Sequence, residues 1–173
     1  MDGNDELYKE ASTTYGAALQ RLARAYEADP ERRRDLLQEI HIGIWRSFRL
    51  FDNRCSLRTW IYRVAHNVGA THVLRSRRIA AQLVDLDALE SEPGFVDGEE
   101  HANQQYSVSR LLDRIHRLNP LDRQIMLLYL EGEQADSIAE VTGLSAVNVA
   151  TKIHRIKRLL NRQLGEGAIH AEG

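Results

Sequence analysis

One acidic segment without a helical pattern divides this chain and limits what it can fold into. Residues 81–106 carry seven acidic side chains and no Lys or Arg. They lack an apolar stripe at helical spacing and contain Pro93, Gly94 and Gly98, residue types that favour turns and extended chain. This composition predicts a linker. We therefore expect two small domains, at residues 1–80 and 107–173, joined by an acidic linker.

Both flanking segments show helical periodicity and no convincing strand alternation, which predicts an all-α fold. In the first domain, a helix is expected over about residues 7–26, with inward residues Tyr15, Ala18, Leu19, Leu22 and Ala25. A second helix is expected from Asp29 and Pro30, an N-cap pair, to about Phe48, with Leu37, Ile40 and Ile44 inward. A third is expected to begin after Ser56 and to end in the Arg-rich run at residues 75–78.

The second domain ends in a pattern typical of a helix-turn-helix. Its first helix is expected near Tyr106, and Asn119-Pro120 begins the next, which ends at Gly132. A short stripe of small apolar residues follows, Gly143 supplies a sharp turn, and Ser145 caps a final helix. A helix of small residues, a Gly turn and a capped second helix are the parts of this DNA-binding motif.

Basic residues are concentrated in two segments of a chain whose net charge is only −2. Residues 54–80 hold six Arg and no acid, and residues 145–164 hold five Lys or Arg and no acid. Two acid-free basic segments on either side of an acidic strip predict two separate contacts with a polyanion.

The final helix has two distinct faces. Its apolar residues recur at helical spacing, at Val149, Ile153, Ile156 and Leu160. Polar and basic residues recur on another face, at Thr151, Arg155, Arg158 and Arg162, with Lys152 and His154 beside them. Such a face suits the major groove, where Lys and Arg meet phosphates and guanine edges. An ordinary amphipathic helix with a solvated basic face is the alternative interpretation.

Other classes of protein are not indicated. No apolar run approaches the ~20 residues of a membrane span, and the N-terminus lacks a signal-peptide pattern, so we expect a cytoplasmic protein without membrane insertion. Cys55 is the single cysteine, and none of the seven His is four residues from another, so no metal site and no cofactor is expected. The sequence contains no Gly-rich phosphate loop and no recognisable catalytic arrangement, so we expect no enzymatic activity.

Three segments in order carry a resemblance to a known family. DLLQEIHIGIWRSF, at 35–48, resembles a helix that docks on the clamp of RNA polymerase. SLRTWIYRVAHNVG, at 56–69, resembles the segment that opens and reads the minus-ten promoter element. LNPLDRQIMLLYLEG, at 118–132, followed by the helix-turn-helix, resembles the domain that reads the minus-thirty-five element. The chain thus resembles the extracytoplasmic-function sigma factors of bacterial RNA polymerase.

The resemblance implies three sets of binding residues. The residues implied in polymerase docking are Asp35, Leu37, Gln38, Glu39 and Ile42. The residues implied at the minus-ten element are Asn53, Arg54, Arg58, Trp60, Arg63, Asn67, Arg75, Arg77 and Arg78. The residues implied at the minus-thirty-five element are Ser145, Asn148, Thr151, Lys152, His154, Arg155 and Arg158.

The implied partners are core RNA polymerase and promoter DNA, together with a possible anti-sigma factor. One departure stands out: the family's docking helix usually begins with acidic residues, whereas this chain has Arg32, Arg33 and Arg34 before Asp35. Trp60 could be a core residue or could support the melted strand. Two other functions also remain open at this point: a stand-alone DNA-binding regulator, and a sigma-like interaction module without promoter function.

Overall fold

The computed structural model describes residues 3–86 and 103–169, with side chains described for 3–81 and 108–162. Its elements in chain order are α1 (Gly3–Tyr26), α2 (Pro30–Ser47), the 3₁₀ turn η1 (Phe48–Leu50), α3 (Leu57–Leu86), α4 (Asn103–Arg117), α5 (Pro120–Leu130), α6 (Ala135–Thr142) and α7 (Ala146–Ile169). The described residues contain no strand, so the all-α prediction is confirmed.

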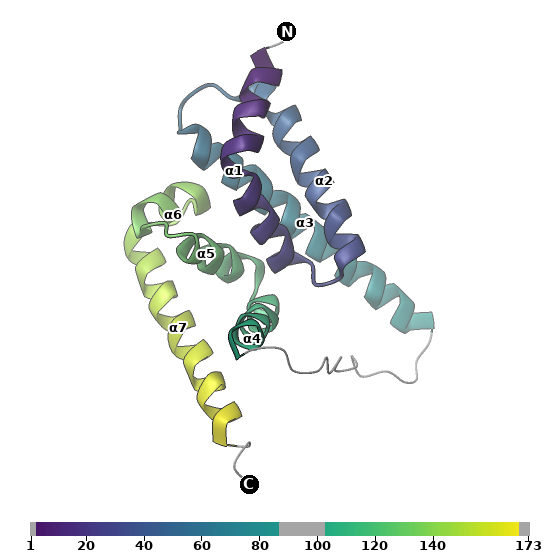
Figure 1. The fold of residues 1–173 in the computed structure, drawn as a ribbon, viewed down its shortest axis with the longest axis vertical. Helices are drawn as coiled ribbons and strands as arrows, with labels where there is room; N and C mark the ends of the chain where they lie inside the picture. Colours follow the sequence, from purple (N-terminus) through teal and green to yellow (C-terminus); the bar gives the residue numbers. More distant parts are fainter. Residues whose placement is uncertain (1–2, 87–102, 170–173) are drawn as a thin grey trace.

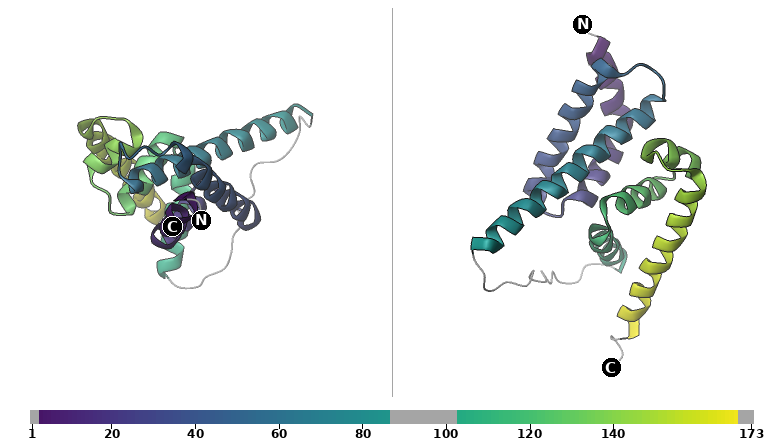
Figure 2. Two further views of the ribbon diagram at one scale, coloured as in Figure 1. Left: turned by 90° about the horizontal axis from the view of Figure 1, so that it is seen from above. Right: turned by 180° about the vertical axis from the view of Figure 1, so that it is seen from behind.

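Helices α1, α2 and α3 pack side by side as one bundle, and α4–α7 form a second group beside it (Figure 1). The start of α1 and the end of α7 lie at opposite ends of the molecule, and α7 runs along its outer side (Figure 2). Fully buried aliphatic side chains form the core of both groups: Leu19, Leu36, Ile40, Ile44, Ile61, Ile115, Ile125, Leu128, Ile138 and Val149.

Local caps define the helix starts, as the sequence predicts. The Asp29 carboxylate accepts a hydrogen bond from the Arg32 amide at 2.8 Å, with Pro30 at the first helical position. The Ser56 hydroxyl accepts one from the Thr59 amide at 3.1 Å at the start of α3. These bonds satisfy amides that have no partner inside the helix, which is why Asp and Ser are favoured at this position.

Two details of the predicted first domain are wrong. Helix α3 continues to Leu86, beyond the expected end at 75–78, so the first residues of the predicted linker are helical. Residues 79–86 contain Ala, Gln and Leu, which favour helix, and no Gly or Pro to end it. In α2, Leu36 is fully buried and Leu37 only half-buried, so the inward stripe is Leu36, Ile40 and Ile44.

A close helix crossing explains the glycine at position 69. A Cβ atom added to Gly69 would lie 2.8 Å from ring atoms of Tyr26, closer than packed carbon atoms approach. Tyr26 is buried, and its hydroxyl lies 3.0 Å from Nδ1 of the buried His66. Gly69 therefore lets α1 and α3 cross with the Tyr26 ring between them.

Candidate nucleic-acid interface

Helices α6 and α7 form the predicted helix-turn-helix. Gly143 ends α6 in the left-handed conformation, φ 77°, which glycine adopts without strain. The Ser145 hydroxyl then accepts a hydrogen bond from the Asn148 amide at 3.2 Å and caps α7. Ile138 of α6 and Val149 of α7 are both fully buried, which holds the two helices together at the turn.

The outer face of α7 carries most of the residues predicted at the upstream element. The side chains that are exposed are Ser145, Asn148, Thr151, His154, Arg155 and Arg158. Lys152 is only partly exposed. The first turn of α7 contains no acidic residue. This surface therefore offers hydrogen-bond donors and positive charge to a polyanion without like-charge repulsion.

A buried carboxylate on α5 fixes two of the basic side chains. Asp122 accepts hydrogen bonds from Lys152 Nζ at 2.8 Å and from Arg155 Nη2 at 3.3 Å. Asn119, the N-cap of α5, also donates to it at 2.7 Å. Burial alone would raise the pKa of Asp122, but the hydrogen bonds and the nearby positive charges outweigh burial and hold the pKa below its usual value. Asp122 thus stays ionised and holds the charged ends of Lys152 and Arg155.

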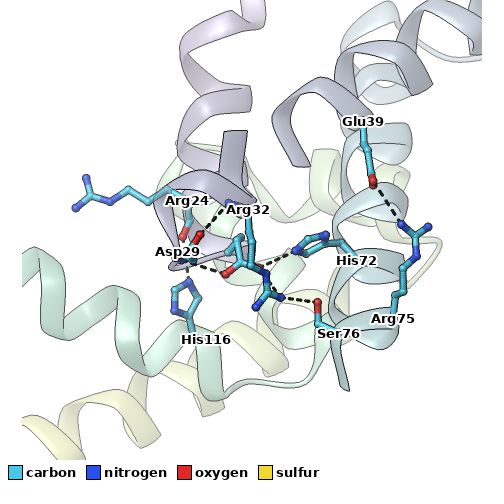
Figure 3. A network of polar contacts seen from close by, with 9 residues as sticks. Arg24, Asp29, Arg32, Glu39, His72, Arg75, Ser76 and His116 are labelled. Carbon is cyan, nitrogen blue, oxygen red and sulfur yellow. Dashed lines mark hydrogen bonds and ion pairs between the residues drawn. The ribbon is translucent and has the colours of Figure 1, made fainter. Parts of the chain in front are cut away.

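Asn67 lies in a groove between α2 and α3. The groove has a volume of about 460 Å³ and is lined by Glu39, Ile42, Gly43, Arg46, Asn67, Val68, Thr71 and Arg75. It brings two residues predicted for polymerase docking, Glu39 and Ile42, next to two predicted for the minus-ten strand, Asn67 and Arg75. Figure 3 shows Arg75 directed at Glu39, with Nη1 3.4 Å from the carboxylate.

Arg32 belongs to a structural network at the start of α2. Its guanidinium lies 3.0 Å from the Glu27 carboxylate and donates to the Ser76 hydroxyl at 2.8 Å (Figure 3). The same Glu27 carboxylate lies 2.8 Å from Nε2 of His72 on α3. Arg32 therefore joins the end of α1, the start of α2 and α3, which is one reason for a basic residue at this point.

Trp60 has a packing role in this structure. Its indole Nε1 donates to the Ser47 hydroxyl at 2.9 Å, and its ring lies 5.4 Å from that of Phe51. The side chain is half-buried against the core. The structure therefore places Trp60 as a support of the loop at 51–56, while Asn53 and Arg54 in that loop are exposed.

The second group of helices covers the start of α3. Arg58 is ion-paired with the buried carboxylate of Glu133. Arg63 donates through Nε to the backbone carbonyl of Glu140 at 3.0 Å, and the Thr59 hydroxyl donates to the Glu140 carboxylate at 3.1 Å. Two of the predicted minus-ten arginines are therefore bound to the C-terminal domain. No sequence pattern indicated this contact.

Further contacts extend this interface. Arg21 of α1 makes two hydrogen bonds to the Glu131 carboxylate, at 2.5 and 2.6 Å. His116 Nε2 lies 3.0 Å from the Arg24 carbonyl oxygen, and the buried Arg123 guanidinium lies 5.3 Å from the centre of the Tyr26 ring. The described arrangement is thus held by charge pairs around a shared apolar core.

Comparison with known proteins identifies both helical groups. Residues 12–79 match sigma-70 region 2, and residues 109–160 match sigma-70 region 4, so the two matches cover well over half of the chain. The ECF RNA polymerase sigma factor SigX of Bacillus subtilis (strain 168) is 22% identical over 164 residues, which span 92% of this chain and 84% of SigX. The ECF RNA polymerase sigma-E factor of Haemophilus influenzae is 27% identical over 138 residues, 75% of this chain and 73% of that one.

The chain belongs to the extracytoplasmic-function sigma factors. As a sigma factor it functions in promoter recognition by RNA polymerase. Region 2 comprises most of α1, all of α2 and most of α3, and region 4 runs from within α4 to the middle of α7.

Two solved structures share the fold. CnrH, in complex with the cytosolic domain of CnrY, aligns with a TM-score of 0.66 at 18% identity, over 92% of this chain and 88% of CnrH. RpoE from Bartonella quintana, in complex with the anti-sigma factor NepR, aligns with a TM-score of 0.67 at 18% identity, over 91% of this chain and 96% of RpoE.

The described residues, 3–86 and 103–169, contain no helix long and apolar enough to cross a bilayer. In the same ranges, no three His, Cys, Asp or Glu side chains are grouped so as to hold a metal ion.

Proposed function

We propose that this sigma factor directs core RNA polymerase to a two-part promoter through two contacts that act at different steps. Region 4 places α7 in the major groove of the upstream duplex. Region 2 holds the melted minus-ten strand in the groove around Asn67. The observation that supports this proposal is the pairing of a recognition helix that has no acidic residue from 146 to 164 with a separate groove on α2 and α3 that contains Asn67 and Arg75.

Docking on polymerase is proposed for the outer face of α2. Asp35, Gln38 and Ile42 are exposed, and Leu37 and Glu39 are half-buried. Ile42 is 49% exposed and the neighbouring Trp45 is 37% exposed, so this face offers apolar area together with the carboxylates. Apolar side chains with a few charges around them are typical of binding surfaces between proteins. Arg33 and Arg34 lie beside this face and make it less acidic than the family pattern.

The proposed downstream contact requires Arg58 and Arg63 to exchange partners. In the described arrangement both are bonded to region 4, whereas Asn67, Arg75, Arg77 and Arg78 are exposed. Phosphate oxygens would replace Glu133 and the Glu140 carbonyl as acceptors. We therefore propose that the two domains separate when the chain engages polymerase and the promoter.

The proposed role is to bind and position other molecules, without a catalytic site of its own. Core polymerase and promoter DNA are the proposed partners, and the cytoplasm is the proposed location because both are found there. Since RpoE from Bartonella quintana was solved in complex with the anti-sigma factor NepR, we propose that an anti-sigma factor can also bind this chain.

Binding of the purified chain to core polymerase, followed by run-off transcription, tests the proposed function. We expect a complex that transcribes from specific promoters selected from genomic DNA. Sequence-specific duplex binding by the free chain with no polymerase complex would favour a stand-alone regulator. A polymerase complex without promoter-dependent RNA would favour an interaction module.

A further inference from the structure

The first turn of α7 presents an apolar side chain where a DNA-reading helix begins. Val147 is 75% exposed, although it is the second residue of this helix. Residues in the first turn of a recognition helix contact base edges. A single exposed apolar residue is ordinary on a protein surface, and Val147 differs because it lies at the start of this helix.

Val147 lies at the centre of the outward face. Counting along the helix, Val147, Thr151, His154 and Arg158 recur at intervals of four, three and four residues, and all of them are exposed. The buried residues of the same helix, Val149, Ile156 and Leu160, lie on the opposite face. The helix face opposite to the core therefore starts at Val147 and continues with polar and basic side chains.

The surroundings of Val147 are also apolar. Ala150 is exposed on the next turn. The Thr151 hydroxyl donates to the Val147 carbonyl oxygen at 2.9 Å, so its donor is already used within the helix. Arg155, farther along, is held by Asp122. The first turns of the outer face thus offer a small apolar patch beside the amide of Asn148.

Helix stability does not explain the valine. β-Branched residues are less favourable in helices than Ala, Glu or Lys, and acidic residues are preferred in the first turn because of the helix dipole. An exposed Val at this position gives neither advantage. A contact with an apolar partner does explain it.

The major groove offers one apolar group on its base edges, the C5-methyl group of thymine. We infer that Val147 contacts a thymine methyl group in the upstream promoter element and selects thymine at that position. This inference rests on the proposed function, because it requires α7 to lie in the upstream major groove. Asn148 and Arg155 then contact neighbouring bases or phosphates, and the Thr151 hydroxyl oxygen can accept a hydrogen bond from a base.

Deoxyuridine provides the test, because it differs from thymidine only by the missing C5-methyl group. Upstream duplexes are first selected from a random library with holoenzyme assembled from this chain. Each thymine of the selected element is then replaced singly by deoxyuridine, and holoenzyme affinity is measured for the wild type and for Val147→Ala. Val108→Ala, which makes the same change at a 50% exposed site on α4, is the matched control.

We expect one thymine at which deoxyuridine lowers wild-type affinity about three- to fivefold, the effect of one buried methyl group. Val147→Ala should lose affinity on the thymine duplex and show no further loss with deoxyuridine at that position, while its response at other thymines is unchanged. Val108→Ala should behave as the wild type does.

Additive effects of Val147→Ala and deoxyuridine at every thymine would overturn the inference, and would leave a protein as the partner of this patch. The absence of any deoxyuridine effect would overturn it as well. Failure of the holoenzyme to select any upstream sequence would instead contradict the proposed function, so the two failures are distinguishable.

Discussion

The ion pair between Arg21 and Glu131 offers a direct way to open the molecule without changing a predicted DNA contact. Arg21 lies on α1 in region 2, and Glu131 lies at the end of α5 in region 4. Both guanidinium–carboxylate bonds are short, at 2.5 and 2.6 Å, and the side chains are 60% and 19% exposed. Reversing the charge of Arg21 should weaken the packing of region 4 on the predicted minus-ten face of α3, which is the side that carries Arg58 and Arg63.

The size of the effect follows from this geometry. An exposed ion pair typically stabilises the contact that it bridges by about 0.2–1 kcal/mol, and a pair with two hydrogen bonds lies near the upper end of that range. Arg21→Glu removes this attraction and adds a repulsion of similar size. The domain contact should therefore weaken by about 1–2 kcal/mol, and the ratio of open to closed molecules should rise about 5- to 30-fold.

Fluorescence energy transfer between Cys55 and a cysteine introduced by Asn161→Cys would report the open fraction. The affinity of the same chain for a single-stranded minus-ten oligonucleotide should rise in proportion to the open fraction, although Arg21→Glu makes the protein more acidic. The double variant Arg21→Glu/Glu131→Arg should restore the closed form. Arg24→Glu is the matched control, because it makes the same charge change one turn along α1 and leaves the Arg21–Glu131 pair intact.

Two results would refute this reasoning. Unchanged energy transfer in Arg21→Glu would show that the pair does not hold the domains together. An equal fall in oligonucleotide binding for Arg21→Glu and Arg24→Glu would show that only total charge matters, and that region 4 does not cover the minus-ten face.

Asp122→Asn should lower the free energy of unfolding by about 1–2 kcal/mol at pH 7, because it removes the buried carboxylate that pairs with Lys152 and Arg155. Denaturant titrations of wild type and variant should give the same stability at pH values below the lowered pKa of Asp122, where the wild-type carboxyl is also neutral. Burial lowers the pKa of His66 to about 3, so the unfolded chain binds its proton near pH 6.5 while the folded chain does not. Stability should therefore fall by up to about 1.4 kcal/mol per pH unit below pH 6.5, and a pH series with His66→Gln should lack that slope. Glu39→Lys should weaken core polymerase binding about three- to tenfold in a titration without unfolding the chain, and unchanged affinity would exclude this face of α2 from docking.

Local signals in the sequence predicted much of the fold. The caps at Asp29, Ser56 and Ser145 and the turn at Gly143 depend on residues within three positions of one another, and the structure has each of them. The end of α3 was misplaced because the predicted boundary followed a change of charge. Helix formation depends on backbone propensity, which stays favourable to Leu86.

Contacts between distant residues could not be predicted in this way. Glu133 is 75 positions from Arg58, and Asp122 is 30 positions from Lys152, so no periodicity connects them. The proposed contact of Val147 lacked a sequence signal for a different reason. Polar and basic residues predict DNA contacts, whereas an apolar residue does not stand out, although thymine also presents an apolar group in the major groove.

The most direct test of the central claim separates the two DNA contacts by the step at which they act. On one promoter, footprinting measures duplex binding by the holoenzyme and permanganate reactivity measures strand opening. Arg155→Ala should weaken duplex binding by about 1–3 kcal/mol, the range for one base contact. Asn67→Ala should leave duplex binding nearly intact and impair opening, because its partner is exposed only after melting. Defects of equal size at the same step in both variants would contradict the account.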